Sequence, residues 1–235
     1  MGAGRLGAGR RVSAAARRLG ILGGTFNPVH LGHLALAEEV RETLDLARVV
    51  FLPAGDPWQK VGIDVTPGAI RFALVERAIA GNPWFAASRL EIDRTGPTYT
   101  AETLAAIADA ERAAGREPDL WFILSAEALA GLPTWRDPDR VLALAHLAVV
   151  PRADDAEDLA AAAVRFVAHF PGHGDRAVFL PGPRLAISST LIRARVAAGR
   201  SIRYLVPETV AAAIREYALY QPSPAPAAST PERSA

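Results

Sequence analysis

Short apolar runs alternate with amphipathic helical segments through the middle of this 235-residue chain. A short apolar run between turn residues is typical of a buried strand. Strands separated by helices run parallel, because the helix returns the chain to the edge where the previous strand began. We therefore predict an α/β fold: one doubly wound, Rossmann-like parallel sheet, in a single domain with a small C-terminal helical part. The five predicted strands are residues 19–22, 49–52, 120–124, 147–150 and 177–180.

The helix predicted after the second strand has clear boundaries. Thr66 is the expected N-cap, Pro67 fits the first helical position, and Gly81 fits the end. Ile70 and Leu74 are then expected to face the core.

Composition limits the domain organisation and the class of partner. Residues 1–18 hold five Arg and no acid, and residues 221–235 are mostly Pro, Ala and Ser, so we expect a disordered basic leader and a disordered tail around a folded part, residues 19–220. Without the leader the chain has 21 basic and 25 acidic residues, which disfavours nucleic-acid binding and favours a small-molecule substrate. We expect no membrane association and a cytoplasmic location, since no apolar run is long enough to cross a bilayer. The chain has no cysteine, which excludes thiol chemistry.

GGTFNPVHLGH, residues 23–33, has the form of a phosphate-binding turn. Gly23 and Gly24 end the first predicted strand and let the backbone approach a bulky anion, while Thr25 and Phe26 continue the turn. A helix that starts here would point its free N–H groups and its dipole at the same place. These features predict a phosphate at the end of the first strand.

His30 and His33 are three residues apart, so at a helix start both imidazoles project from one face. They are either phosphate contacts, a structural pair or two zinc ligands. Zinc needs at least a third protein ligand, and the sequence has neither cysteine nor an HExxH pattern, so phosphate contact is favoured and no metal site is predicted.

ISSTLIR, residues 187–193, repeats the pattern near the other end of the chain. Ser188, Ser189 and Thr190 supply hydroxyls at a helix start, and Arg193 lies one turn further on. The alternative is that Ser-Ser-Thr is only a good N-cap. Together the two segments predict the two halves of one nucleoside-triphosphate site.

At this point the motifs resemble a known family. HLGH after GGTFNP, with ISSTLIR late in the chain, resembles the nucleotidylyltransferase superfamily, which shares its H-x-G-H signature with class I aminoacyl-tRNA synthetases. Five further segments occur in the same order as in bacterial nicotinate-nucleotide adenylyltransferases, so residues 19–220 are interpreted as such a catalytic domain. These segments are DPWQK (56–60), GPTYTAETL (96–104), GLPTW (131–135), AHLAVVPR (145–152) and GRSIRYLVP (199–207).

The resemblance implies adenylyl transfer from ATP to nicotinate mononucleotide, with Mg²⁺ carried by ATP and no tightly bound organic cofactor. It implies that His30, His33 and Arg193 are catalytic and that the glycine turn and the hydroxyl cluster bind ATP. Trp135 would stack on the pyridine ring, although an unassigned Trp is more often core, and Thr100 would lie near the pyridine carboxylate. Lys60 and Arg152 would lie near the mononucleotide phosphate. A homo-oligomer is left open.

Two positions depart from the family pattern. Asn27 stands where the family usually has Asp, and LSAEAL (124–129) stands where a Gly-x-Asp triplet is common, with Ser125 and Glu127 at the Gly and Asp positions. Glu127 is expected to hydrogen-bond a ribose of ATP, with a longer arm than Asp. Two alternative functions stay open: transfer to another phosphate acceptor such as phosphopantetheine, against which GPTYT, GLPTW and RYLVP argue, and a nucleotide-binding sensor without turnover, which Ser125 and Glu127 suggest.

Overall fold

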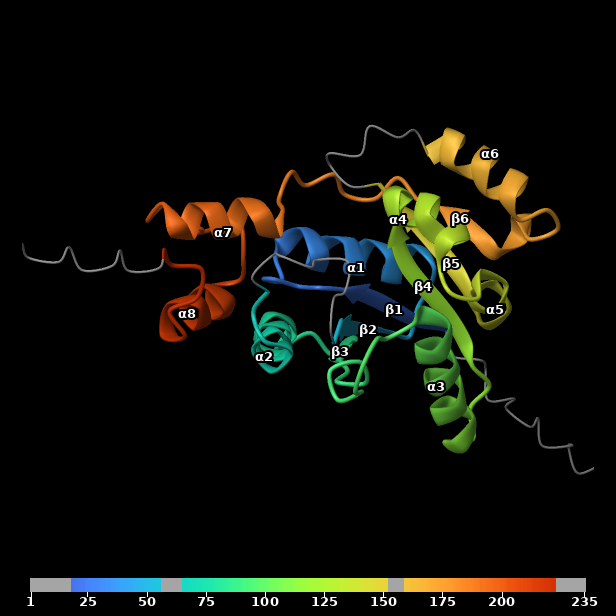
Figure 1. Ribbon diagram of the computed structural model, residues 1–235, viewed down its shortest axis with the longest axis horizontal. Coiled ribbons are helices and arrows are strands. Elements are labelled where there is room, and N and C mark those ends of the chain that lie inside the picture. The colour runs from blue at the N-terminus through green and yellow to red at the C-terminus, as the bar shows by residue number, and fades with distance from the viewer. Residues whose placement is uncertain (1–17, 56–64, 152–158, 223–235) are drawn as a thin grey trace, which may run out of the picture.

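The computed structural model describes residues 18–55, 65–151 and 159–222 of the chain. Lys60 and Arg152 lie outside these ranges, as do almost all of the predicted leader and tail. Within the described ranges six parallel strands form one sheet in the order β3-β2-β1-β4-β5-β6 (Figure 1). The strands are β1 Arg18–Gly24, β2 Arg48–Pro53, β3 Phe85–Ala87, β4 Asp119–Ser125, β5 Ala145–Val150 and β6 Ala177–Phe179.

The strand order confirms the doubly wound parallel sheet. It reverses between β1 and β4, and the carboxyl ends of these two neighbouring strands are where a fold of this class binds its ligand. All five predicted strands are present. β3 was not predicted, because its three half-buried residues, Phe-Ala-Ala, are too short an apolar run to indicate a strand.

Eight α-helices are described. They are α1 Leu31–Thr43, α2 Gly68–Ile79, α3 Thr100–Ala113, α4 Ala126–Gly131, α5 Pro138–Leu144, α6 Leu159–His169, α7 Ser189–Ala197 and α8 Glu208–Glu216. One short 3-10 turn, Leu132–Thr134, follows α4. No helix among the described residues is long and apolar enough to cross a membrane.

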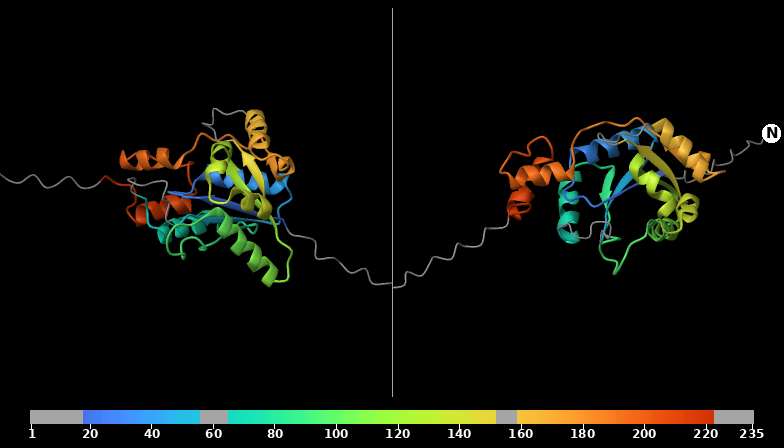
Figure 2. Two further views of the ribbon diagram at one scale, coloured as in Figure 1. Left: turned by 45° about the vertical axis from the view of Figure 1, so that its right-hand side comes forward. Right: turned by 45° about the horizontal axis from the view of Figure 1, so that its top comes forward.

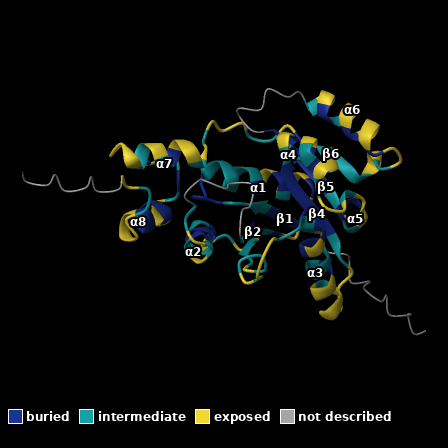
Figure 3. Cartoon of the chain, viewed as in Figure 1, coloured by how far each residue is buried: buried dark blue, intermediate teal, exposed yellow. Residues whose placement is uncertain are grey.

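The side chains of the sheet divide between two cores, one on each face. Side chains alternate along a strand, so Ile21 and Leu22 of β1 enter different cores. Buried residues of α1, α2, α7 and α8 complete the first core, and those of α3, α4, α5 and α6 complete the second. Figure 3 shows the result, with the central strands largely buried and the outer faces of the helices exposed.

The last two helices form the predicted C-terminal helical part. α7 and α8 lie together at one end of the molecule, and they remain together in both further views (Figure 2). Val210 and Ile214 of α8 are buried in the first core, which joins this part to the rest of the domain.

The inward face of α2 differs from the prediction. Pro67 is the N-cap, so the helix begins one residue later than expected, and it ends at Ile79, before Gly81. Leu74 is buried as predicted, but Ile70 is only half-buried, and Arg71 is the residue of that turn that enters the interior. An apolar pattern cannot predict a buried arginine, because the position depends on which oxygen atoms surround it.

Candidate active site

The glycine turn connects β1 to α1 at the carboxyl edge of the sheet. β1 ends at Gly24, His30 is the N-cap of α1, and Phe26 between them has a left-handed backbone with φ of 48°. The Phe26 side chain is buried, and its ring meets the His33 ring edge-on at a centroid distance of 5.0 Å. The turn is thereby held against the start of the helix, where the N–H of Leu31 donates to the Leu205 carbonyl at 3.0 Å and the N–H of His33 to the His30 carbonyl at 2.9 Å.

His30 and His33 lie face to face. Their ring centroids are 3.6 Å apart, and the backbone N–H of His30 donates to Nδ1 of His33 at 3.2 Å. Because Nδ1 accepts this hydrogen bond, the proton of a neutral His33 is on Nε2, where it is a donor for an incoming oxygen atom.

The start of α7 is hydrogen-bonded to the glycine turn. The Ser189 hydroxyl donates to the Pro28 carbonyl at 2.8 Å, and Nη1 of Arg193 donates to the Asn27 carbonyl at 2.9 Å. Nη2 of Arg193 also approaches the Thr190 hydroxyl at 3.4 Å. The structure therefore brings the two predicted nucleotide segments together, although about 160 residues separate them in the sequence.

The hydroxyls of this segment have different tasks. Ser188 is the N-cap of α7, and its hydroxyl accepts the backbone N–H of Leu191 at 3.1 Å. The N-cap alternative therefore applies to Ser188. Ser189 instead makes the long-range bond to the glycine turn, and Thr190 is exposed beside Arg193.

Phe122 of β4 connects the glycine turn to Trp135. A Cβ built on Gly23 would lie 3.5 Å from the Phe122 ring, and the same ring meets the Trp135 ring edge-on at 6.1 Å. Trp135 is half-buried and follows the 3-10 turn after α4. The predicted acceptor tryptophan is thus one aromatic ring away from the predicted phosphate turn.

Thr100, the predicted carboxylate contact, is the first residue of α3 and is half-buried. The residue before it, Tyr99, lies under the Arg136 guanidinium at 4.4 Å from the ring centroid. Arg136 directly follows Trp135, so this cation–π contact joins the two segments that carry the predicted acceptor residues.

Comparisons with known proteins fit this geometry. Residues 21–195 match the Cytidylyltransferase-like family. The chain is 48% identical over 203 residues to a protein of Roseiflexus sp. (strain RS-1) named probable nicotinate-nucleotide adenylyltransferase, a match that covers 86% of this chain and 98% of the relative. A protein of the same name from Thermomicrobium roseum is 42% identical, over 87% of this chain and 92% of the relative. The chain belongs to the nicotinate-nucleotide adenylyltransferase family.

Solved structures agree on the fold. The chain superposes on a Plasmodium falciparum nicotinic acid mononucleotide adenylyltransferase complexed with NaAD, with a TM-score of 0.68 at 16% identity, over 87% of this chain and 97% of that one. A protein from Vibrio parahaemolyticus described as a putative nicotinate-nucleotide adenylyltransferase gives a TM-score of 0.61 at 18% identity, over 88% of this chain and 97% of that one. At such identities the likeness shows a shared fold.

The departure from the family pattern at Ser125 has a local explanation. Ser125 is the N-cap of α4, and its hydroxyl accepts the backbone N–H of Ala128 at 3.1 Å. A serine at this position satisfies a helix-end donor that glycine would leave to water. Glu127 lies in the first turn of α4 and is exposed, at the carboxyl end of β4.

Tyr220 is a contact of the glycine turn that the sequence motifs did not reveal. Its phenol donates to Oδ1 of Asn27 at 3.0 Å, and Asn27 is 2% exposed. Burial raises the pKa of the Tyr220 phenol, so it stays protonated and remains a donor at neutral pH. An aspartate at position 27 could accept the same bond, so Asn27 keeps the contact and removes only the charge.

Glu91 is a second residue that sequence reasoning missed. The Thr103 hydroxyl donates to its carboxylate at 2.9 Å and the Thr98 hydroxyl at 3.3 Å. Burial raises the pKa of Glu91, and these two hydrogen bonds oppose the shift. Thr98 belongs to the GPTYT segment, so Glu91 fixes the loop that leads into Thr100.

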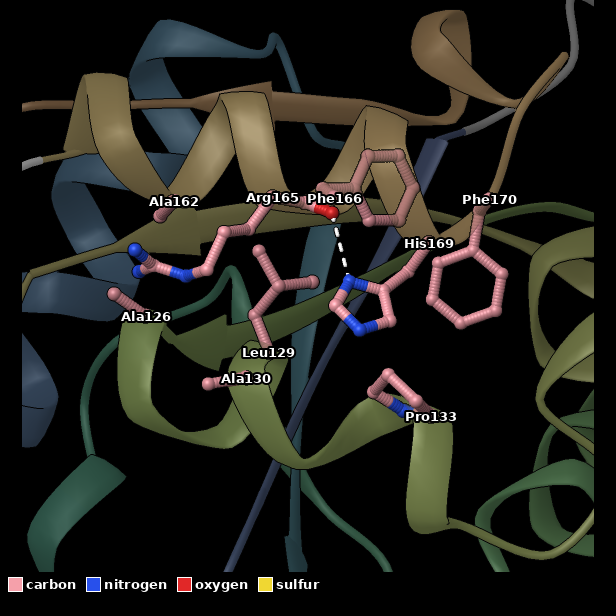
Figure 4. Close-up of a pocket in the computed structure, with 9 residues that line it drawn as sticks. All are labelled: Ala126, Leu129, Ala130, Pro133, Ala162, Arg165, Phe166, His169 and Phe170. Carbon is pink, nitrogen blue, oxygen red and sulfur yellow. Dashed lines mark hydrogen bonds between the residues drawn. The ribbon is translucent and has the colours of Figure 1, made fainter.

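A small hollow lies between α4 and α6. It is lined mainly by apolar side chains such as Leu129 and Phe166, and His169 at its edge donates from Nδ1 to the Arg165 carbonyl at 3.0 Å (Figure 4). None of the predicted site residues lines it.

Proposed function

We propose that this chain transfers the adenylyl group of ATP to nicotinate mononucleotide, giving nicotinate adenine dinucleotide and pyrophosphate. The observation that carries the proposal is the pair of hydrogen bonds that joins α7 to the glycine turn, from Ser189 and from Arg193. They place both nucleotide motifs at one sheet edge, in a chain that belongs to a family named for this reaction.

The reaction needs placement and charge neutralisation. The mononucleotide phosphate is already ionised at neutral pH, so it attacks the α-phosphorus of ATP in line without a general base. Pyrophosphate leaves with the electron pair of the broken P–O bond. Holding the two anions in line supplies several kcal/mol, and each donor aimed at the transition-state oxygens adds about 3 to 4 kcal/mol in favourable cases.

The donors on the ATP side are assigned by their geometry. His33 presents its Nε2–H because its Nδ1 is occupied, and it is our first choice for a contact with the transferring phosphate. Arg193 is held by the Asn27 carbonyl through one nitrogen and has further N–H groups for phosphate oxygens. His30 stacks on His33 and holds the orientation of its ring. In the proposed site it also helps to stabilise the negative charge of the ATP phosphates. Backbone N–H groups of the glycine turn and of the start of α7 complete the proposed site.

On the acceptor side we assign Trp135 to the pyridine ring. An electron-poor pyridinium stacks favourably on the electron-rich indole face. Thr100 at the start of α3 is assigned to the pyridine carboxylate, where its hydroxyl and the helix N-terminus both favour an anion. Lys60 and Arg152 remain proposals for the mononucleotide phosphate.

We propose that Mg²⁺ comes with ATP. Among the described residues no group of three or more His, Cys, Asp or Glu lies close enough to hold a metal ion. A magnesium ion that keeps most of its waters and binds phosphate oxygens needs no such cage, and it neutralises part of the triphosphate charge. We propose no tightly bound organic cofactor. Cytoplasmic placement and the domain limits, residues 19–220, also remain proposals.

The test is a steady-state assay of purified protein with ATP and three acceptors: nicotinate mononucleotide, nicotinamide mononucleotide and phosphopantetheine. We expect dinucleotide with the first and lower kcat/KM with the amide, because the amide lacks the charge that the start of α3 stabilises. Pyrophosphate release with phosphopantetheine alone would reassign the acceptor. Saturable ATP binding without any product would favour a nucleotide sensor.

A further inference from the structure

Arg71 is a buried charged residue that the proposed reaction does not use directly. It lies in the first turn of α2 and is 1% exposed. Burial lowers the pKa of its guanidinium, which nevertheless stays charged at neutral pH because its ordinary pKa is so high. A charge in the interior costs free energy unless hydrogen bonds compensate it, so its contacts indicate what it does.

Among the residues that the structure describes, the guanidinium of Arg71 donates to backbone carbonyls. Nη1 donates to the Thr25 carbonyl at 2.7 Å, and Nη2 donates to the carbonyls of Ala54 at 2.6 Å and Gly55 at 3.0 Å. Nε donates to the Thr66 carbonyl at 2.8 Å. Four of its five N–H groups are thus used inside the protein, and the side chain is too deeply placed to contact a substrate.

Three of these four carbonyls belong to two different strand ends, and the fourth, that of Thr66, precedes α2. Thr25 lies in the glycine turn after β1, whereas Ala54 and Gly55 follow β2. A backbone bond from the Ala54 N–H to the Gly24 carbonyl, 2.9 Å long, joins the same two segments. One planar cation therefore fixes the turn that is assigned to ATP relative to the segment that leads toward Lys60.

The segment after β2 also packs on the acceptor loop. A side chain on Gly55 would collide with the carbonyl of Glu91, so these two backbones are in close contact. Glu91 in turn holds Thr98 of the GPTYT segment. The chain of contacts from Arg71 thus runs in one direction to the glycine turn and in the other to the loop before Thr100.

We propose that Arg71 is a positioning residue that sets the distance between the ATP site and the acceptor site. This inference rests on the proposed function. The rigid fork of the guanidinium holds the carbonyls of two segments at fixed separations, which a flexible lysine ammonium cannot do. In-line transfer depends on the relative placement of two bound anions, and a misplacement of about 1 Å can cost about a hundredfold in rate.

Loss of Arg71 is expected to affect turnover and substrate binding differently. If Arg71 sets the spacing of two half-sites, its loss leaves each substrate able to bind alone and lowers the rate within the complex of both. A residue that only stabilises the fold would lower the melting temperature and leave kcat per folded molecule unchanged. A residue that only shapes the glycine turn would weaken ATP binding alone.

The experiment compares Arg71→Lys with the full-length wild-type enzyme and with Arg77→Lys. Arg77 lies on the same helix, and its guanidinium pairs with Glu216 at the surface, so it is a matched control. We measure kcat per folded molecule, with folding checked by circular dichroism, and the dissociation constants of a non-hydrolysable ATP analogue and of nicotinate mononucleotide separately. For Arg71→Lys we expect kcat to fall at least about tenfold, with each dissociation constant changed less than about threefold.

Unchanged kcat per folded Arg71→Lys molecule would overturn the proposal, and so would a loss confined to the binding of one substrate. Ala54→Pro provides a second variant should the first fold poorly, because it removes the N–H that bonds to Gly24 and loosens the same junction without touching the core. The same selective loss of kcat is expected, and a wild-type kcat would again overturn the proposal. A wild-type enzyme that forms no dinucleotide would overturn the proposed function itself.

Discussion

Hydrogen bonds between distant parts of the chain hold the proposed ATP side of the site, whereas ring contacts and the shorter-range hydrogen bonds of Glu91 hold the proposed acceptor side. The glycine turn receives side-chain donors from Arg71, Ser189, Arg193 and Tyr220. Trp135 is held by the edge of Phe122. Hydrogen bonds fix direction and ring contacts tolerate sliding, so we expect the glycine turn to be held more rigidly than Trp135.

His33→Ala is the largest expected effect and tests the rigid side. It removes the Nε2–H donor, so kcat should fall at least about a hundredfold while the KM for nicotinate mononucleotide changes little. Steady-state rates with both substrates measure this. His169→Ala, on the surface of α6, is the control and should stay within about twofold of wild type. A comparable loss in the two variants would contradict the assignment.

Arg193→Gln should cost about tenfold to a hundredfold in kcat/KM for ATP, because it removes a charged donor and the bond to the Asn27 carbonyl. Arg195→Gln on the same helix is the matched control, since Arg195 bonds the Ser201 carbonyl instead. Competition with pyrophosphate provides a second measurement. Equal losses in the two variants would show that the charge of α7 matters and the position of Arg193 does not.

Trp135→Ala tests the acceptor side. Loss of ring stacking worth about 1 kcal/mol should raise the KM for nicotinate mononucleotide by about fivefold to tenfold and leave the KM for ATP unchanged. Trp84→Ala provides the control, because Trp84 is about half exposed and packs under Arg41. A larger increase in the KM for ATP than in the KM for nicotinate mononucleotide would contradict the assignment of Trp135 to the acceptor side.

Tyr220→Phe tests how far the rigidity of the glycine turn depends on the phenol of Tyr220. It leaves the buried Oδ1 of Asn27 without this donor, which should lower the free energy of unfolding by about 1 to 3 kcal/mol and raise the KM for ATP a few-fold. Denaturant unfolding and steady-state kinetics measure the two effects. Tyr217→Phe, at the surface, should change neither by a comparable amount.

Glu91→Gln has the smallest expected effect and concerns stability at different pH values. The folded-state pKa of Glu91 is raised by burial, so this carboxyl favours folding most below its ordinary pKa and loses that contribution as pH rises through the raised value. The melting temperature of Glu91→Gln relative to wild type should therefore increase as pH rises across that window. A difference that is constant with pH would contradict the shift.

The sequence predicted the parts of the site that have local patterns. The strands are apolar runs, and the His pair and the Ser-Ser-Thr segment are short motifs next to helix starts, so the sheet and the meeting of the two nucleotide segments could be expected before any coordinates. Arg71 and Tyr220 could not be predicted from patterns, because what distinguishes them is a set of carbonyl and amide oxygens that come from other parts of the chain. The burial of Glu91 was hidden for the same reason.

The bond between Tyr220 and Asn27 has a consequence for synthesis on the ribosome. Strands β1, β2 and β4 are complete once about half of the chain has emerged, yet the turn between β1 and α1 receives its donors from residues 189, 193 and 220. Contacts of such long sequence separation form late. The nascent chain can therefore build most of its sheet before these hydrogen bonds to the glycine turn form, and the proposed triphosphate site is complete only when translation of the domain is almost finished.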